Sequence, residues 1–436
     1  MCGAPPDGVA TLAAVKAPKV LPLLANLLSA AFSLAFGIAL IEFVIVPLAL
    51  SLLPLRLHDG LPRGYRVLAQ SSKAGTVPHD YIALAGDSHA QGAGDWFLAV
   101  DVAHNPPFHS AHLIHERTGR DVITFGAAGA SNLRGLVTEP ATTVAYLQQT
   151  ALLSIEAPDD LLFYFYEGND LNDNLADLAA RYDPDWDRAR IRDPAYFRRF
   201  LDEVVIGQSP THLEAVDFSW TDNLVMTRFV FRVVEALFTR EWSLTPRENE
   251  FPNSQKNRAR VGVAEVALPD ALQAPALDLT DAQLDLALYV FDQAFAFLVE
   301  HFPDTRIEVV YLPSTLTSYA ITSPQVDIQV RQEDVSQAVY PTALLGVRSD
   351  RICAAVEATA QRDRAAFVDL RPLLWKASAA HLVHGPRDWK HMNRDGQQVL
   401  AEGALAALRA AEAGERGGSC ASYQRLQAET KAGGAG

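Results

Sequence analysis

A serine, a histidine and an aspartate in this chain together have the chemistry of a hydrolytic site. Ser88 follows the apolar stretch 81–85 within three residues, where a strand is expected to end and a helix to begin. A hydroxyl there can attack a carbonyl if a base takes its proton. His391 is the candidate base, because Asp388 precedes it by three residues and one turn can bring a carboxylate to the imidazole Nδ1. The three residues predict acyl chemistry through an acyl-serine intermediate.

A carbonyl under attack also needs hydrogen-bond donors for its developing negative charge. The backbone N–H of Ser88 is one candidate. The backbone N–H of Gly129 is a second, since glycine lets the backbone approach a ligand closely. The side-chain amide of Asn169 is a third, because it donates without carrying a charge. Each of these residues lies just beyond a predicted strand, so we expect them to form an oxyanion hole at one edge of a sheet.

Several of these positions also have a structural interpretation. Ser88 alone could be a helix N-cap, and Asp170 suits the N-cap of the next helix better than catalysis. Gly126 suits a turn. His89 fits a substrate contact or a structural role equally well. His384 is a rival base, but it has no acid three residues before it.

The composition narrows the class of protein. The chain has 436 residues with a formal net charge of -15, which argues against a nucleic-acid partner. Its three cysteines fit no metal-binding spacing, and Cys353 lies in an apolar helical pattern that suggests a core position. The sequence contains no phosphate-binding loop, no G-x-S-x-G elbow and no H-E-x-x-H motif. No metal or organic cofactor is implied.

Strands and helices alternate along most of the chain. The predicted strands are 81–85, 122–125, 161–166, 306–312 and 366–370, and the predicted helices between and after them include 137–154, 284–302, 350–362 and 397–411. This alternation predicts a parallel sheet with helices on both faces, with the ligand beyond the carboxyl ends of the strands. Residues 171–280 interrupt the alternation and are interpreted as a mainly helical insertion over the site.

The N-terminal part carries a long apolar run. Residues 20–55 are long and apolar enough for a transmembrane helix, with the best span at about 23–46 and Glu42 towards one interface. A cleaved signal peptide, a helical hairpin and a buried soluble helix are the alternatives. Residues 1–19 and 413–436 are predicted to be disordered, 56–78 to be a linker, and 79–412 to be the catalytic domain.

Four short blocks resemble the SGNH hydrolases, the GDSL esterase/lipase superfamily. They are Gly86-Asp87-Ser88-His89, Gly126-Ala127-Ala128-Gly129, Glu167-Gly168-Asn169-Asp170 and Asp388-Trp389-Lys390-His391. The resemblance implies a flavodoxin-like three-layer α/β/α fold. It also implies a site in which Ser88, Gly129, Asn169 and His391 are the four family residues, with Asp388 completing the triad. His89 stands where the family has leucine, and Glu167 stands where the third block has glycine, which puts the geometry of that turn in question.

Together these observations predict a membrane-anchored esterase or O-acyltransferase. The expected substrate is an acylated carbohydrate or lipid of the cell envelope, with acetyl as the expected acyl group. A membrane-held site suits such a substrate, so the catalytic domain is expected outside the cytoplasm, in the periplasm. The alternatives are a lipase or thioesterase that acts on long acyl chains at the membrane, and a non-catalytic assembly subunit with this fold.

Overall fold

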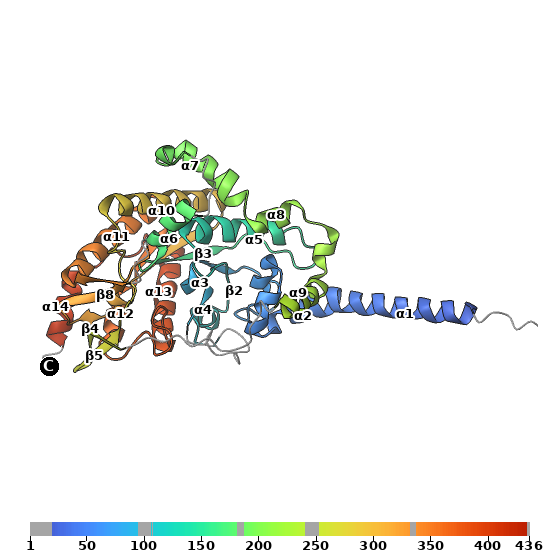
Figure 1. Ribbon diagram of the computed structural model, residues 1–436, viewed down its shortest axis with the longest axis horizontal. Coiled ribbons are helices and arrows are strands. Elements are labelled where there is room, and N and C mark those ends of the chain that lie inside the picture. Colours follow the sequence, from blue (N-terminus) through green and yellow to red (C-terminus); the bar gives the residue numbers. More distant parts are fainter. Residues whose placement is uncertain are drawn as a thin grey trace, which may run out of the picture.

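The centre of the molecule is a five-stranded parallel sheet with helices on both faces (Figure 1). The structure is a computed structural model, and it describes residues 20–94, 106, 108–180, 187–239, 253–331 and 337–433. The strands are β1 (Ile82–Gly86), β2 (Val122–Thr124), β3 (Asp160–Tyr166), β6 (Arg306–Leu312) and β10 (Ala366–Asp369). Their order, β10-β6-β3-β1-β2, is the flavodoxin-like order, so the predicted fold class is confirmed.

Strand β3 explains why the sheet is covered on both sides. Its residues Leu161, Phe163 and Phe165 join one apolar core, and the intervening Leu162, Tyr164 and Tyr166 join the other. The first core is closed by η6 (Leu133–Thr138), α5 (Glu139–Leu147), α10 (Asp281–His301) and α11 (Ala343–Arg362). The second is closed by α4 (Ser110–Thr118), α12 (Arg371–Ser378) and α13 (Arg394–Glu412). A strand buried on both faces is apolar throughout, which made β3 recognisable in the sequence.

The segment 56–78 is part of the body, and its prediction as a linker is wrong. It forms η3 (Leu55–Gly60) and η4 (Arg63–Ala69), and Tyr65 is buried with its hydroxyl donating to the Asp222 carbonyl at 2.8 Å. A Cβ on Gly64 would lie 2.1 Å from the ring of Tyr146. The glycine therefore permits close packing of backbone on an aromatic ring, and does not mark a flexible spacer.

The C-terminal segment is also ordered, contrary to the predicted disordered tail. Cys420 forms a disulfide with Cys353, and α14 (Tyr423–Gly433) follows it. The backbone of Phe367 in β10 exchanges hydrogen bonds with Arg416 and Gly418 at 3.0 Å each. These long-range bonds order a stretch whose small and polar composition alone suggested disorder. Residues 1–19 and 434–436 lie outside the described residues.

The insertion is helical in its first part only. Its helical elements are α6 (Asp170–Ala180), η7 (Arg188–Arg190), α7 (Pro194–Phe200), η8 (Leu201–Ile206), α8 (Pro210–Val216), η9 (Trp220–Asn223) and α9 (Val225–Thr239). The second part contains a hairpin of β4 (Asn253–Val261) and β5 (Ala264–Pro269), extended by β7 (Ala320–Ile321). A separate hairpin joins β8 (Gln325–Gln329) and β9 (Gln337–Pro341). The prediction of a mainly helical insertion is therefore wrong for this second part. Buried Asn257 in β4 donates to the Pro269 and Asp327 carbonyls, and these partners are not apparent from the polar composition of the stretch.

The apolar N-terminal run begins with a helix that projects from the body (Figure 1). It comprises α1 (Val20–Leu40), η1 (Ile41–Ile45), α2 (Val46–Ala49) and η2 (Leu50–Leu52). Two helices among the described residues are long and apolar enough to cross a membrane, 22–52 and α10. Helix α10 packs on the central sheet and is a core helix. From residue 22 to residue 40 the side chains of α1 are exposed, whereas contact with the body begins at Glu42.

Candidate active site

Ser88, His391 and Asp388 lie in one hydrogen-bonded chain. The Nε2 atom of His391 is 2.8 Å from the Oγ atom of Ser88. On the other side of the ring, Nδ1 is 2.6 Å from Oδ2 of Asp388. The structure therefore brings together the predicted nucleophile, base and orienting acid, although 303 residues separate the first two. Ser88 is only 8 % exposed, so its environment excludes most water.

Strand β1 and a short helix place the serine. Gly86 ends β1 with φ 137°, and a Cβ at this position would lie 2.7 Å from the Tyr164 carbonyl oxygen. Asp87 then caps α3 (Ser88–Gln91) by accepting a bond from the His89 N–H at 2.8 Å. Ser88 is thus the first helical residue, where a backbone N–H has no intrahelical partner. The N-cap role that Ser88 alone could have had belongs to Asp87.

The loop between α12 and α13 carries the base and its acid. Asp388 accepts bonds from the backbone N–H groups of Lys390 and His391 at 2.9 and 3.3 Å, in addition to the imidazole. Burial alone would raise the pKa of Asp388, but the hydrogen bond and charge of His391, with the two backbone donors, lower it to about 2. The carboxylate is therefore ionised near neutral pH. It accepts a hydrogen bond from Nδ1 of His391, and it thereby favours the tautomer with the proton on Nδ1.

The proposed oxyanion donors lie on neighbouring loops. Asn169 reaches the serine through Asp87, whose carboxyl is 3.3 Å from the Ser88 Oγ and is also hydrogen-bonded by the Asn169 amide. The same amide nitrogen donates to Oδ2 of Asp173 at 2.9 Å. Gly129 has φ 63° and is exposed in the turn after β2, a turn that starts beside Gly86 with the Ala127 N–H 3.4 Å from the Gly86 carbonyl. The left-handed conformation explains why this position is a glycine.

The contacts of Glu167 explain how the third block can have a glutamate in place of the family's glycine. Its fully buried carboxylate accepts bonds from the backbone N–H of Ser314 at 2.8 Å and the Ser349 hydroxyl at 2.8 Å, and also from the hydroxyls of Tyr311 and Thr317. The side chain therefore turns towards β6 and α11 to tie neighbouring elements together. The turn before Asn169 accommodates the larger residue because these donors replace its water shell.

Two further histidines lie beside the triad but are not placed as bases. His89 is fully buried; its ring centroid is 5.0 Å from that of His391 and 4.0 Å from that of Tyr166. Burial and the neighbouring His391 hold its pKa well below the usual value. Burial likewise lowers the pKa of His384 to about 3, and its Nδ1 is 3.2 Å from the Tyr319 hydroxyl. Both rings are therefore neutral near pH 7.

Acidic groups accumulate behind the nucleophile. Burial raises the pKa of Asp87, and burial together with the charge of Asp87 raises that of Asp170 well above its usual value. Asp170 lies in the first turn of α6 and accepts bonds from the Tyr166 N–H and the Asn132 amide, both at 3.1 Å. Its place is inside the helix, one residue beyond the N-cap expected for it.

Asp173 is a site neighbour that sequence reasoning missed. It joins the Asn169 amide to Arg331, whose Nη1 lies 2.8 Å from Asp173 Oδ1. A signal existed, since Asn169 and Asp173 are four residues apart and so share a face of α6. Lys390 belongs to the loop that carries Asp388 and His391, and burial and the charge of the same Arg331 lower its pKa.

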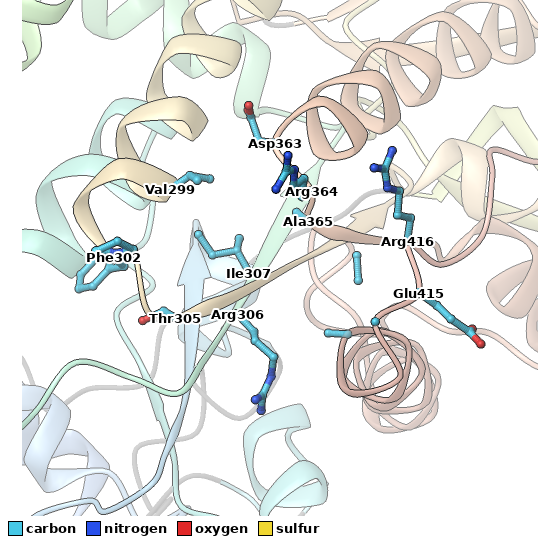
Figure 2. Close-up of a pocket in the computed structure, with 14 residues that line it drawn as sticks. Val299, Phe302, Thr305, Arg306, Ile307, Asp363, Arg364, Ala365, Glu415 and Arg416 are labelled. Carbon is cyan, nitrogen blue, oxygen red and sulfur yellow. The ribbon is translucent and has the colours of Figure 1, made fainter.

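A cavity of about 510 Å³ lies at the amino ends of strands β6 and β10, away from the carboxyl ends where Ser88 is located (Figure 2). Its lining includes Arg306 and Ile307 at the start of β6, and Ala366 at the start of β10. Ser88 follows the carboxyl end of β1, and the strands are parallel, so this cavity is not the pocket of the triad.

One group of close ligand-type side chains occurs among the residues that the structure describes. It comprises Cys353, Asp369 and Cys420. The two sulfurs are joined in the disulfide and are therefore not thiolate ligands.

Comparison with known proteins gives a distant likeness. No protein-family model matches the chain, and no curated protein matches it. Among solved structures it is similar to an extracellular lipase from Streptomyces rimosus, with 16% sequence identity and a TM-score of 0.33. The match covers 76% of this chain and 98% of the lipase. Likeness at this level does not assign the chain to a family, so its chemistry is inferred from its own side chains.

Proposed function

We propose that this protein is a serine ester hydrolase of the SGNH type, which hydrolyses or transfers an O-acyl group. The observation that carries the proposal is the chain from Ser88 Oγ through the His391 ring to Asp388, with separations of 2.8 and 2.6 Å. Both distances are within the reach that nucleophile–base and base–acid pairs need.

The reaction follows from the positions of the atoms. Ser88 Oγ attacks the acyl carbonyl while His391 Nε2 takes its proton, and the ionised Asp388 stabilises the imidazolium that forms. The backbone N–H groups of Ser88 and Gly129 and the amide of Asn169 are the proposed donors to the oxyanion. The imidazolium then protonates the leaving alcohol, which leaves an acyl-serine. Water completes hydrolysis, and an acceptor hydroxyl completes transfer.

Three features support a membrane anchor in place of a cleaved signal. Helix α1 has 21 residues, a length of about 31 Å that matches the roughly 30 Å core of a bilayer. Its side chains from residue 22 to residue 40 are exposed, as lipid-facing side chains would be. The pattern Ala49-Leu50-Ser51, with a small residue at each end, is the candidate signal-peptide cleavage site. Cleavage there would also remove Glu42, Val46 and Leu50, which are all buried in the body.

The disulfide supports a body outside the cytoplasm. Cys353 and Cys420 are 67 residues apart and are joined at a Cα–Cα distance of 6.0 Å. Disulfides of this structural kind form in oxidising compartments, of which the periplasm is one. We therefore place the triad on the extracytoplasmic side, where acylated envelope carbohydrates and lipids are the available esters. Acetyl is the proposed acyl group, and long acyl chains are the alternative.

Acid-quench mass spectrometry tests the proposal. Full-length protein is mixed with p-nitrophenyl acetate, quenched in acid and digested, and the peptide containing Ser88 is expected to gain an acetyl group. Ser88→Ala must show neither the adduct nor turnover. A series of p-nitrophenyl esters from acetate to palmitate then separates the acyl classes, and a rate that rises with chain length would contradict the acetyl preference. Absence of any adduct on folded wild-type protein, with no turnover, would contradict the proposal itself.

A further inference from the structure

Helix α9 has two apolar sides, and the body uses only one of them. At about 100° per residue, Met226, Phe229 and Val233 share one side of the helix. This side packs inward: Met226 and Phe229 contact the core, and a Cβ on Gly60 would lie 2.6 Å from the Phe229 ring and 3.4 Å from Val233. Packing of this kind accounts for the inward side alone.

The second apolar side faces outward. It consists of Val230, Phe231, Val234 and Phe238, and we call these four residues the outer face of α9. Phe231 is 71% exposed and Phe238 is 84% exposed. Arg228, Arg232 and Glu235 occupy the remaining third side of the helix. Two phenylalanines and two valines gathered on one exposed side exceed the scattered apolar residues of an ordinary surface.

The start of α9 is tied directly to the end of α1. Glu42, in the turn that follows α1, accepts bonds from the N–H groups of Met226 and Thr227 at 2.9 and 2.6 Å, and from the Thr227 hydroxyl at 2.6 Å. These bonds satisfy the free donors at the start of α9. Helix α9 packs against η1 and η3 at the end of the body from which α1 projects (Figure 1). One carboxylate thus fixes α9 next to the exit of the apolar helix.

Other exposed apolar side chains surround the same exit. Trp220 is 65% exposed, and its ring centroid is 5.8 Å from that of Phe43 in η1. Leu48 and Leu52, which follow η1, are 75% and 66% exposed. Tryptophan is enriched where a membrane helix meets the headgroup layer, because its ring is apolar and its N–H is polar.

The chain between α1 and the body is packed closely and contains no flexible linker within the described residues 41–78. Segment 56–78 packs in the core, and Val46 and Leu50 are already buried. If α1 spans a bilayer, its end at Leu40 lies at the membrane surface, and Glu42 then holds α9 at that surface. Amphipathic helices with apolar side chains of this kind lie in the boundary between headgroups and acyl chains.

We infer that the outer face of α9 is a lipid-binding surface that rests in the headgroup–acyl boundary of the bilayer that α1 spans. The occupant is the lipid of that bilayer, argued from the attachment of α9 to the end of the apolar helix through Glu42 and from the exposed Trp220 that lies beside Phe43. The inference rests on the membrane anchor of the proposed function but not on esterase activity. It implies that the catalytic body is held against the membrane in a fixed orientation.

Site-directed spin labelling of the full chain in phosphatidylcholine liposomes tests this inference. Phe231→Cys and Val234→Cys, each in a Cys2→Ser background, are labelled with a nitroxide, and the disulfide-bonded Cys353 and Cys420 offer no free thiol. Collision with oxygen, which concentrates in lipid, is compared with collision with the water-soluble nickel complex NiEDDA. We expect oxygen accessibility to exceed nickel accessibility at both positions.

Two controls use residues of the same chain. Glu235→Cys lies on the polar side of α9, and Val263→Cys lies in the β4–β5 turn, where Val263 is fully exposed. Both labels are expected to collide more with nickel than with oxygen. High nickel accessibility at 231 and 234, equal to that at 263, would overturn the inference. Shielding from both reagents would indicate a protein partner or a second copy and would also overturn it.

Fluorophosphonate labelling of the same samples separates this inference from the proposed function. A lipid-type accessibility at 231 and 234 in protein whose serine does not react would sustain the membrane surface and reject the esterase. The opposite pair of results would reject the membrane surface alone.

Discussion

Replacing Asp388 by asparagine removes one charge from the site and leaves its shape. The wild-type carboxylate accepts the Nδ1 proton of His391 at 2.6 Å and two backbone N–H groups, and its pKa falls from 3.8 to about 2. That shift corresponds to about 2 kcal/mol of favourable interaction already present in the resting site. The interaction strengthens when His391 becomes an imidazolium. An amide turned with its NH₂ group towards Nδ1 would hold the wrong tautomer, with the proton on Nε2.

We therefore expect Asp388→Asn to lower kcat/KM by about 10³- to 10⁴-fold, equivalent to roughly 4–5 kcal/mol of barrier. The assay is hydrolysis of p-nitrophenyl acetate by full-length protein in detergent or nanodiscs, with kcat and KM measured separately. KM should change little, because Asp388 does not contact the substrate and is linked to the nucleophile only through the two hydrogen bonds of His391. Asp395→Asn is the matched control, since this carboxylate is 55% exposed and lies 4.0 Å from His381, away from the triad. A decrease of less than about tenfold in Asp388→Asn would refute the role assigned to the acid.

Three other predictions concern stability. Because the pKa of Asp388 is lowered in the folded state, the ionised carboxylate stabilises the fold above about pH 4, and this stabilisation disappears as the pH falls through 2. The free energy of unfolding in urea should therefore fall over that range by about 2 kcal/mol more for wild type than for Asp388→Asn. Parallel pH curves for the two proteins would contradict this. The free energy of unfolding of the double variant Cys353→Ser/Cys420→Ser should be about 4 kcal/mol lower than that of wild type, because the disulfide closes a 67-residue loop. An unchanged thermal unfolding temperature would show that the disulfide is not formed. His89→Leu should leave the fold as stable or raise its stability by about 1–2 kcal/mol, because both ring nitrogens are buried without a partner among the described residues; a clear loss in calorimetry would reveal a partner.

The central sheet could be predicted because burial on both faces leaves a continuous apolar signal. The stretch 306–312 was placed at its observed bounds, and 161–166 misses only Asp160 at the start of β3. Asp160 is polar, yet it is fully buried and held by the guanidinium of Arg306 at 2.6 and 2.8 Å. A local pattern cannot contain that partner, since it lies 146 residues away.

The same limit explains the segments that were predicted wrongly. In 56–78 and in 413–433, glycine, serine and proline suggested mobility, whereas the order comes from distant contacts such as Tyr65 with Tyr146 and Cys420 with Cys353. The polar strand β4 was concealed for a related reason, because it is paired at a small outer sheet and not buried on two faces.

The arrangement of Ser88, His391 and Asp388 could be predicted from the sequence because the proposed chemistry restricts the residue types and, for Asp388 and His391, the spacing. The surrounding network was not. Glu167 was interpreted as a departure from a family block, but its five hydrogen bonds come from residues at 311–349. Asp173 contacts both Asn169 and Arg331, and only its spacing from Asn169 is visible in the sequence. The partners of Glu167 follow only from the arrangement of elements in space.

Covalent labelling with a fluorophosphonate probe tests the central claim most directly. The probe reacts with a serine only when a base and an oxyanion hole activate it, and peptide mapping identifies the modified residue. We predict that the full-length protein is labelled at Ser88, that Ser88→Ala is not labelled, and that labelling of His391→Ala falls to the background. Folded wild-type protein that remains unlabelled, or labelling that persists in Ser88→Ala, would contradict the assignment of Ser88 as the nucleophile.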